Sequence, residues 1–235
     1  MRSLESLLRH AAEYPRMFRD AFRVRRQLRA LPDALPHTEA LDLARGLIWY
    51  GGRLRPTQAT DEVVWLLEKL EQDPPKTIVE IGTDEGGTLF LWTRVAAPDA
   101  LLVAVDSRPL GILGQLSAYA IVRKGLARKR QRIELVMPVN SQIQATVDRV
   151  RGLIENKPVD FLFIDGDHSY EGVKRDFELW SPLVRPGGLV AFHDMRPDHP
   201  DGVPRLWAEL KERFETEERI ASTEPNYGIG VVHVP

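Results

Sequence analysis

The sequence of 235 residues contains no cysteine. A chain without thiols forms no disulfide, binds no zinc or iron–sulfur cluster through thiolates, and has no cysteine nucleophile. Long hydrophobic runs are absent too. None approaches the ~18 apolar residues of a membrane-spanning helix, and charges interrupt the first twenty residues, where a signal peptide needs an apolar core. We therefore expect a chain that begins near Met1 and works in the cytoplasm.

Sequence motifs of several well-known protein classes are missing as well. The chain has no G-x-S-x-G, no Walker phosphate-binding loop and no H-E-x-x-H. This argues against the familiar serine hydrolases, P-loop nucleotide hydrolases and zinc proteases. There is no zinc-finger spacing and no aromatic RNA-binding signature, and the formal net charge is only −2. We therefore expect no nucleic-acid partner.

Positive charge gathers near the N-terminus. Residues 1–30 hold eight arginines against three acidic residues, and their apolar side chains recur at helical spacing. This pattern predicts an amphipathic basic helix. We expect its apolar face to pack on its own domain or on a second subunit, which favours a homo-oligomer. Contact with a membrane surface or an acidic partner is the alternative.

From residue 77 onward, short β-rich segments alternate with helical ones. This alternation predicts an α/β fold: a Rossmann-like, seven-stranded, mostly parallel sheet with helices on both faces. The last two strands have no helix between them, so the last strand should be antiparallel. We expect a helical extension over residues 1–53 and one domain over 54–235. The predicted strands are 77–81, 101–105, 133–136, 159–164, 189–192, 218–222 and 228–234. The predicted helices are 39–50, 57–71, 87–95, 112–126, 142–154, 170–183 and 203–214.

A glycine turn follows the first of these strands. Residues 82–87 read GTDEGG, and a helix opens at Thr88. Glycines allow a ligand close to the backbone, and a helix start offers free N–H donors, so the turn predicts a nucleotide-like cofactor. Asp106 ends the next strand, where an acid can bind ribose hydroxyls. The G-x-x-x-G-G spacing and the acidic Glu80, Asp84 and Glu85 favour cationic S-adenosylmethionine, with an NAD-dependent oxidoreductase as the alternative.

Polar side chains also end two later strands. Asp165 follows strand 159–164, and His193 and Asp194 follow strand 189–192. Because carboxyl ends of neighbouring parallel strands meet at one crevice, these three residues should converge and could hold a divalent metal. Carboxylates favour magnesium, whereas an imidazole shifts the preference toward manganese, iron or zinc. His168 could then remove a proton from a substrate hydroxyl. The two histidines with one aspartate could instead form the site of an iron-dependent hydroxylase.

Three motifs together resemble a known family. VEIGTDEGGT (79–88), IDGDHSYEGV (164–173) and LVRPGGLVAFHD (183–194) are similar to motifs of class I S-adenosylmethionine-dependent methyltransferases. Within that group the sequence resembles the small metal-dependent O-methyltransferases, of the cephalosporin-hydroxylase-like and macrocin O-methyltransferase-like types, with catechol O-methyltransferase a more distant relative. The resemblance covers residues 54–234.

The resemblance implies specific cofactor contacts. Glu80 and Gly82 would line the methionine part, Thr88 would meet its carboxylate, and Asp106 would bind the ribose. Residues 140–142 occupy the place of the adenine-contacting segment, and Gln58 lies in the stretch that covers the cofactor. The full predicted set is Gln58, Glu80, Gly82, Asp84, Gly86, Thr88, Asp106, Asn140, Ser141, Gln142 and Asp165.

The resemblance also implies the chemistry. Asp165 matches the first metal-binding acid, and His193 with Asp194 falls where the family places a second ligand pair, with His193 replacing a carboxylate. His168 lies where the catechol enzymes keep a lysine base, so His168 or Asp165 would take the proton. The implied reaction is methyl transfer to a hydroxyl of a small molecule, either a sugar moiety of a natural product or a vicinal phenol, with magnesium as the expected metal. A non-catalytic binding module that uses the basic arm is a further alternative.

Overall fold

A computed structural model of the protein describes residues 4–50, 52–110, 116–128, 130–195, 202–222 and 227–235, with side chains from residue 13 onward. None of the described helices combines the length and the apolar composition that a membrane crossing needs.

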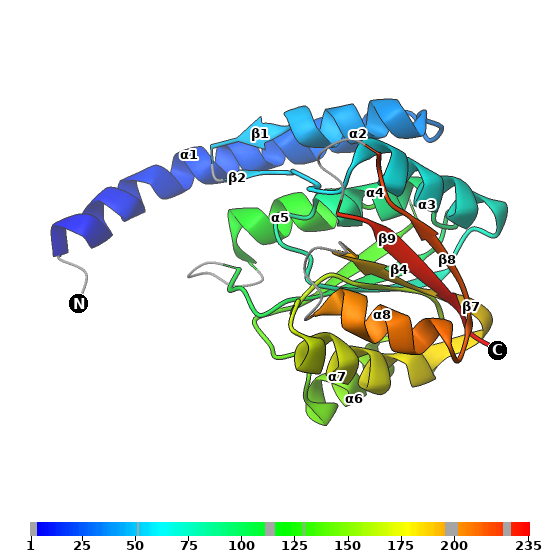
Figure 1. Ribbon diagram of the computed structural model, residues 1–235. Coiled ribbons are helices and arrows are strands. Elements are labelled where there is room, and N and C mark those ends of the chain that lie inside the picture. Colours follow the sequence, from blue (N-terminus) through cyan, green and yellow to red (C-terminus); the bar gives the residue numbers. More distant parts are fainter. Residues whose placement is uncertain (1–3, 51, 111–115, 129, 196–201, 223–226) are drawn as a thin grey trace.

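A seven-stranded sheet forms the centre of the molecule, in the order β5-β4-β3-β6-β7-β9-β8 (Figure 1). The strands from β5 to β7 pair in parallel, whereas β9 is antiparallel to both β7 and β8. The predicted mostly parallel sheet with an antiparallel last strand is therefore confirmed. The strands are β3 (Thr77–Ile81), β4 (Leu101–Val105), β5 (Arg132–Val136), β6 (Val159–Ile164), β7 (Val184–His193), β8 (Glu215–Arg219) and β9 (Ile229–His233).

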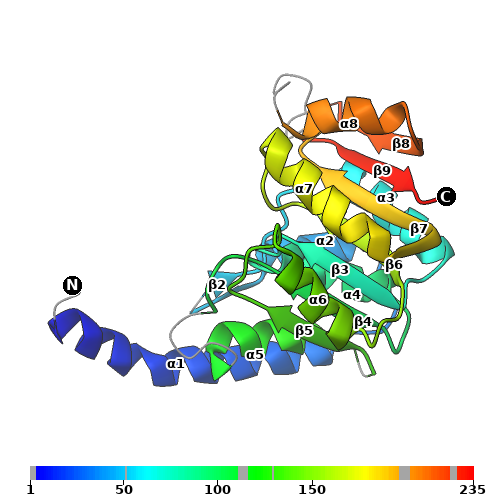
Figure 2. The same ribbon diagram turned by 90° about the horizontal axis from the view of Figure 1, so that it is seen from below.

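Helices cover both faces of the sheet, as Figures 1 and 2 show. Neighbouring strand residues point to opposite faces, so Ile78 belongs to one hydrophobic cluster and Val79 to the other. One face carries α2 (His37–Gly46), α3 (Thr60–Gln72), α4 (Gly87–Val95) and α5 (Ala118–Gly125), and the other carries α6 (Gln144–Leu153), α7 (Tyr170–Trp180) and α8 (Val203–Lys211). The crossovers between parallel strands supply most of these helices, as this fold class requires.

The long helix α1 (Leu4–Arg29) lies along α5, and its N-terminal end projects beyond the other helices (Figures 1 and 2). Its apolar side chains Ala21, Val24 and Leu28 are buried in the same cluster as α4 and α5. The predicted basic helix is thus present, and its C-terminal half packs on its own chain.

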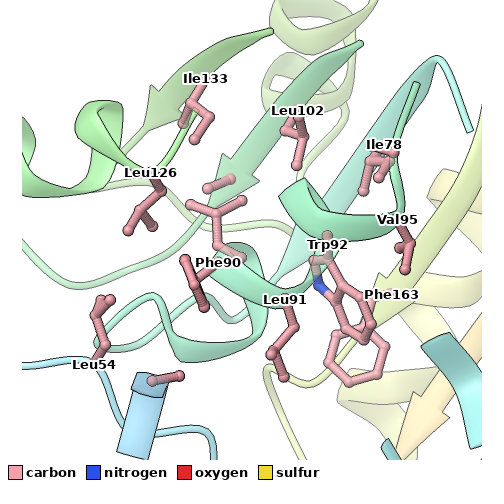
Figure 3. Packing of buried hydrophobic residues seen from close by; sticks show 14 of the residues in the cluster. Leu54, Ile78, Phe90, Leu91, Trp92, Val95, Leu102, Leu126, Ile133 and Phe163 are labelled. Atoms are coloured by element: carbon pink, nitrogen blue, oxygen red, sulfur yellow. The ribbon is translucent and has the colours of Figure 1, made fainter. Parts of the chain in front are cut away.

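Aromatic side chains fill the space between α4 and the sheet (Figure 3). The ring centroid of Trp92 lies 5.3 Å from that of Phe161 and 5.0 Å from that of Phe163, both in edge-on geometry. The indole N–H of Trp92 donates to Glu80 Oε1 at 2.7 Å, which gives the buried indole a polar partner. Truncating a buried tryptophan of this kind costs ~3–5 kcal/mol. This packing fixes α4 against β3, directly below the glycine turn.

Four segments differ from the sequence predictions. Strand β8, predicted at residues 218–222, lies three residues earlier, at Glu215–Arg219. Helix α2 ends at Gly46, and a short hairpin of β1 (Ile48–Trp49) and β2 (Gly52–Arg53) replaces the predicted end of that helix at residue 50. Strand β7 begins at Val184, five residues early, because Val184 pairs with Val159 of β6 before a register irregularity; Arg185 Nε also donates to Asp160 on β6 at 2.6 Å. The predicted helix 112–126 is shorter, Ala118–Gly125, because extended Ser117 caps its start; residues 111–115 of the prediction lie outside the described part.

Candidate functional site

The carboxyl ends of β3, β4 and β6 meet at Gly82. The Gly82 N–H donates to Val105 O at 2.9 Å, and the Asp165 N–H donates to Ile81 O at 2.8 Å. Gly82 adopts φ +84°, and a Cβ atom there would clash with the backbone oxygen of Asp165. Only glycine fits at this point, because both the left-handed backbone and the close approach exclude a side chain.

A cavity of about 630 Å³ opens at this crevice. Eight of the residues predicted for the site line it: Gly82, Asp84, Asp106, Asn140, Ser141, Gln142, Asp165 and His168. The other predicted cofactor residues, Gln58, Glu80, Gly86 and Thr88, are buried behind this lining. The segments that follow strands β3 to β6 therefore bring these eight residues together around one hollow, as expected for a doubly wound sheet.

Asp106 holds the two loops on one side of the cavity. Its Oδ2 accepts from the Asp84 N–H at 2.8 Å, and its Oδ1 accepts from the Arg108 N–H at 2.7 Å. Burial raises the pKa of Asp106, although the Arg108 N–H and the charge of Arg123 oppose the shift. Arg108 pairs with the Asp84 carboxylate, and Arg123 donates to the Asp84 carbonyl. Neither arginine was predicted for the site: Arg108 belongs to no motif, and Arg123 begins a basic cluster (123–132) that is typical of a helix end.

Glu80 lies beneath the glycine turn with one unused oxygen. Its Oε1 accepts from Trp92, whereas Oε2 is buried and has no hydrogen-bond partner among the described residues. Burial raises the pKa of Glu80 to about 7. The hydroxyl of Thr83 is also buried without a described partner. Such unsatisfied groups are costly, so a ligand that supplies a donor or a positive charge here would stabilise the site.

Asp165, His168 and Asp194 converge at the rim of the cavity. A carboxylate oxygen of each aspartate and one ring nitrogen of His168 all lie within 4.8 Å of one another. His168 Nε2 is 3.1 Å from Asp194 Oδ2 and 3.6 Å from Asp165 Oδ1. Asp194 adopts φ +61°, a conformation that aspartate tolerates and that is often found at functional sites. Two carboxylates and an imidazole form a donor set that suits a divalent metal.

His193 lies behind this group instead of within it. Its side chain is only 3% exposed, and Nδ1 lies 3.1 Å from Asp165 Oδ1 and 3.5 Å from Asp194 Oδ2. Burial acts to lower the pKa of His193, but the two carboxylates outweigh it and raise the pKa to about 10. Burial likewise acts to raise the pKa of Asp165, and His193 with His168 brings it below its usual value. His193 is thus a buried cation that faces both aspartates.

Gln58 completes the surroundings of Asp165. Its Nε2 donates to Asp165 Oδ2 at 2.9 Å. This bond joins the segment before α3 to the end of β6, although the two residues are 107 positions apart. Sequence analysis placed Gln58 near the cofactor but did not anticipate this contact.

A family model described as a methyltransferase domain matches residues 79–195, from β3 to just beyond the end of β7. These residues, about half of the chain, form a methyltransferase domain. The matched region of this methyltransferase contains the glycine turn, Asp106 and the cluster of Asp165, His168 and Asp194.

Two curated relatives of this methyltransferase share about a third of the aligned residues. It is 32% identical over 155 residues to the uncharacterized protein y4gI of Sinorhizobium fredii, covering 63% of this chain and 16% of y4gI. It is 32% identical over 122 residues to the uncharacterized protein R132 of Acanthamoeba polyphaga mimivirus, covering 50% of this chain and 51% of R132. The chain therefore matches only part of each relative.

Solved structures share the fold of this methyltransferase. The O-methyltransferase TomG of Streptomyces achromogenes, in complex with S-adenosylmethionine, aligns with a TM-score of 0.57 and 19% identity over 88% of this chain and 92% of TomG. The Bacillus cereus O-methyltransferase aligns with a TM-score of 0.59 and 17% identity over 88% of this chain and 93% of the Bacillus protein. MycE, from the mycinamycin biosynthetic pathway, aligns with a TM-score of 0.58 and 16% identity over 85% of this chain and 54% of MycE.

Proposed function

We propose that this protein is an S-adenosylmethionine-dependent O-methyltransferase that acts on a hydroxyl group of a small molecule with the help of a divalent metal. One observation carries the proposal: Asp165 and His168 line the same cavity as Gly82 and Asp106. The residues suited to a metal and to proton transfer thus adjoin those suited to the cofactor. The comparisons offer no support for the NAD-dependent or iron-dependent alternatives.

The cavity fits the cofactor at three points. The unpartnered Oε2 of Glu80 would accept from the amino group of the methionine part, and the Gly82 backbone would lie against it. Each oxygen of Asp106 keeps a free lone pair for a ribose hydroxyl. The segment from Asn140 to Gln142 lines the cavity where the adenine would lie. TomG contains S-adenosylmethionine, which supports this choice.

Asp165 and Asp194 are the residues that we propose as metal ligands. Their carboxylates suit magnesium, which MycE contains. Sequence analysis included His193 among the ligands, but its burial behind both aspartates supports a positioning role instead. A bound metal would make a coordinated hydroxyl more acidic.

His168 is the proton acceptor in this proposal. Its side chain is 58% exposed, against 14% for Asp165 and 23% for Asp194, so a substrate hydroxyl can reach it. The carboxylate of Asp165 raises the pKa of His168, and that of Asp194 adds to the shift. The imidazole can therefore hold the proton once it is transferred, with the new positive charge next to both carboxylates.

The acceptor classes that we propose are sugar hydroxyls of natural products and vicinal phenols. MycE in complex with mycinamycin VI, and TomG, which is involved in tomaymycin synthesis, support the natural-product class. Both are biosynthetic methyltransferases of the same fold.

Calorimetric titration tests the cofactor. S-adenosylmethionine and, separately, NAD are titrated into the wild type, with and without magnesium. We expect saturable binding of S-adenosylmethionine alone, at least about tenfold weaker in Asp106→Ala, because loss of a charged hydrogen-bonding group costs ~1.5–3 kcal/mol. Asp99→Ala, which changes an exposed aspartate before β4, is the matched control and should bind as the wild type does. Binding of NAD, or no binding of either, would contradict the proposal.

A further inference from the structure

A second cavity, of about 680 Å³, lies at the opposite edge of the sheet from the carboxyl ends. Arg132, the first residue of β5, contributes to its wall, together with the C-terminal ends of α1 and α5. Figure 2 shows these two helices side by side. At Gly125 of α5 a Cβ atom would lie 2.7 Å from Arg25 Cγ, so α1 is held close to α5 at this point. This cavity is as large as the one assigned to the cofactor.

The lining of this cavity is strongly basic. Six cationic residues and two acidic ones, Asp33 and Glu134, line it, although the whole chain has a net charge of −2. The cationic residues are Arg25, Arg29, Arg94, Lys124, Arg128 and Arg132. Within the part of the chain that the structure describes, none of the six forms an ion pair with a carboxylate.

Two of these cations are tied to backbone carbonyls. Arg128 donates to Asp33 O and Arg94 O, both at 3.1 Å, and Arg94 donates to Leu126 O at 3.5 Å. Arg128 Nε is buried and has no described partner. Burial, with a contribution from Arg128, lowers the pKa of Arg94 to about 10. Arg25 shows the same effect: burial and then Arg29 lower its pKa.

Helix ends account for only part of this charge. Helices α1, α4 and α5 all end here, and each C-terminus carries roughly half a negative charge. Three such helix ends supply a charge of about −1.5, whereas the six cationic and two acidic residues together carry a formal net charge of +4. Positive charge therefore remains unbalanced in a partly buried space, where repulsion between like charges is stronger than in water.

We propose that this cavity binds a small molecule that carries two or more phosphate groups. Planar guanidinium groups recognise phosphate through paired N–H donors, and several of them together suit a multiply charged anion. Arg25, Arg29, Lys124 and Arg132 have no side-chain hydrogen-bond partner among the described residues and remain available for the ligand. The inference does not rest on the proposed methyltransferase activity.

The test is calorimetric titration of the full chain with inorganic tripolyphosphate and with uridine diphosphate at constant ionic strength. We expect one saturable site, weakened at least tenfold in the triple variant Arg29→Gln/Lys124→Gln/Arg132→Gln. If uridine diphosphate binds at least tenfold more tightly than tripolyphosphate, the source is a nucleotide. If the two bind alike, the phosphate groups alone are recognised.

A matched triple variant removes the same charge from the other face of the sheet: Arg149→Gln/Arg151→Gln/Arg175→Gln, on α6 and α7. It should bind tripolyphosphate as the wild type does. Circular dichroism and Tm establish that each variant is folded. No saturable binding by the wild type, equal weakening in the two triple variants, or loss of binding in Asp106→Ala would overturn the proposal.

Discussion

His193 Nδ1 lies 3.1 Å from Asp165 Oδ1, and the imidazole is buried between β7 and the two aspartates. The aspartates are close enough to repel each other, and His193 supplies the neighbouring positive charge. Removing one partner of a buried pair leaves an uncompensated charge, so His193→Leu should lower the free energy of unfolding by ~3–5 kcal/mol. Urea denaturation measures this.

His233→Leu is the control for that experiment. His233 pairs with Glu217 at 2.7 Å but is 29% exposed, and exposed pairs contribute ~0–1 kcal/mol. An equal loss of stability in the two variants would show that His193 does not have the stabilising role described above.

Gly82→Ala should disrupt the fold at the cofactor cavity. The new Cβ atom would meet the Asp165 carbonyl, and alanine at φ +84° is itself strained by ~1–2 kcal/mol. We expect a loss of at least ~2 kcal/mol in unfolding free energy and loss of S-adenosylmethionine binding. Gly152→Ala, in α6 with open space around it, should instead gain up to ~1 kcal/mol. A Gly82→Ala protein as stable as the wild type would contradict the geometry.

His168→Gln separates proton transfer from metal binding. A general base contributes ~10²–10⁴-fold to the rate, so kcat should fall at least a hundredfold, while the Kd values of magnesium and S-adenosylmethionine stay within about twofold. Single-turnover methyl transfer and metal titration measure the two effects. The control is His37→Gln, at a histidine that pairs with Glu71 and does not line the cavity, and its kcat and Kd values should equal those of the wild type. A large loss of magnesium affinity would assign His168 to the metal instead.

Asp176 on α7 makes stability depend on pH. It is fully buried, and burial raises its pKa to about 6, above the ~3.9 expected in the unfolded chain. Between pH ~3.9 and about 6, Asp176 is protonated in the folded protein but ionised in the unfolded chain. Its contribution to the free energy of unfolding is therefore fully present below pH ~4 and is lost as pH rises through 6. At ~1.4 kcal/mol for each pKa unit, the loss is ~3 kcal/mol.

The neutral variant Asp176→Asn should therefore gain stability over the wild type as pH rises from 4 to 7. Urea denaturation at several pH values measures the difference between the two proteins. Asp99→Asn, at an exposed aspartate, is the control and should show no such trend. A constant difference between Asp176→Asn and the wild type across this range would contradict the prediction.

The central sheet could be predicted from the sequence because its strands are short, buried apolar runs with polar ends. The bounds of β3, β4 and β6 agree with the prediction to the residue. The hairpin of β1 and β2 could not be predicted, since two-residue strands have no periodicity. The start of β7 was missed because its Arg-Pro-Gly-Gly segment is typical of a turn, whereas Val184 before it pairs with Val159 of β6 and the segment forms an irregular part of the strand.

It could be predicted from the sequence that Asp165, His168 and Asp194 lie close together, but not how each side chain is oriented. Spacing shows that Asp165, His168, His193 and Asp194 follow strand ends, yet it cannot show which imidazole faces the cavity. His193 is the last residue of β7, flanked by β6 and β9, and is therefore buried, whereas His168 lies on an open loop. The basic cavity depends on how α1 packs against α5, which the pattern of either helix alone does not show.

The position of β9 in the sheet affects the order in which the chain can fold while the ribosome synthesises it from the N-terminus. This strand lies between β7 and β8, and β8 pairs with no other strand among the described residues. A ribosome-bound chain that has emerged only as far as residue 228 can form the parallel part of the sheet, and side chains of α3 and α8 can contact β8, but the strand with which β8 pairs is still missing. Completion of the sheet therefore waits for residues 229–233, which capture an earlier segment on one side while they pair with β7 on the other.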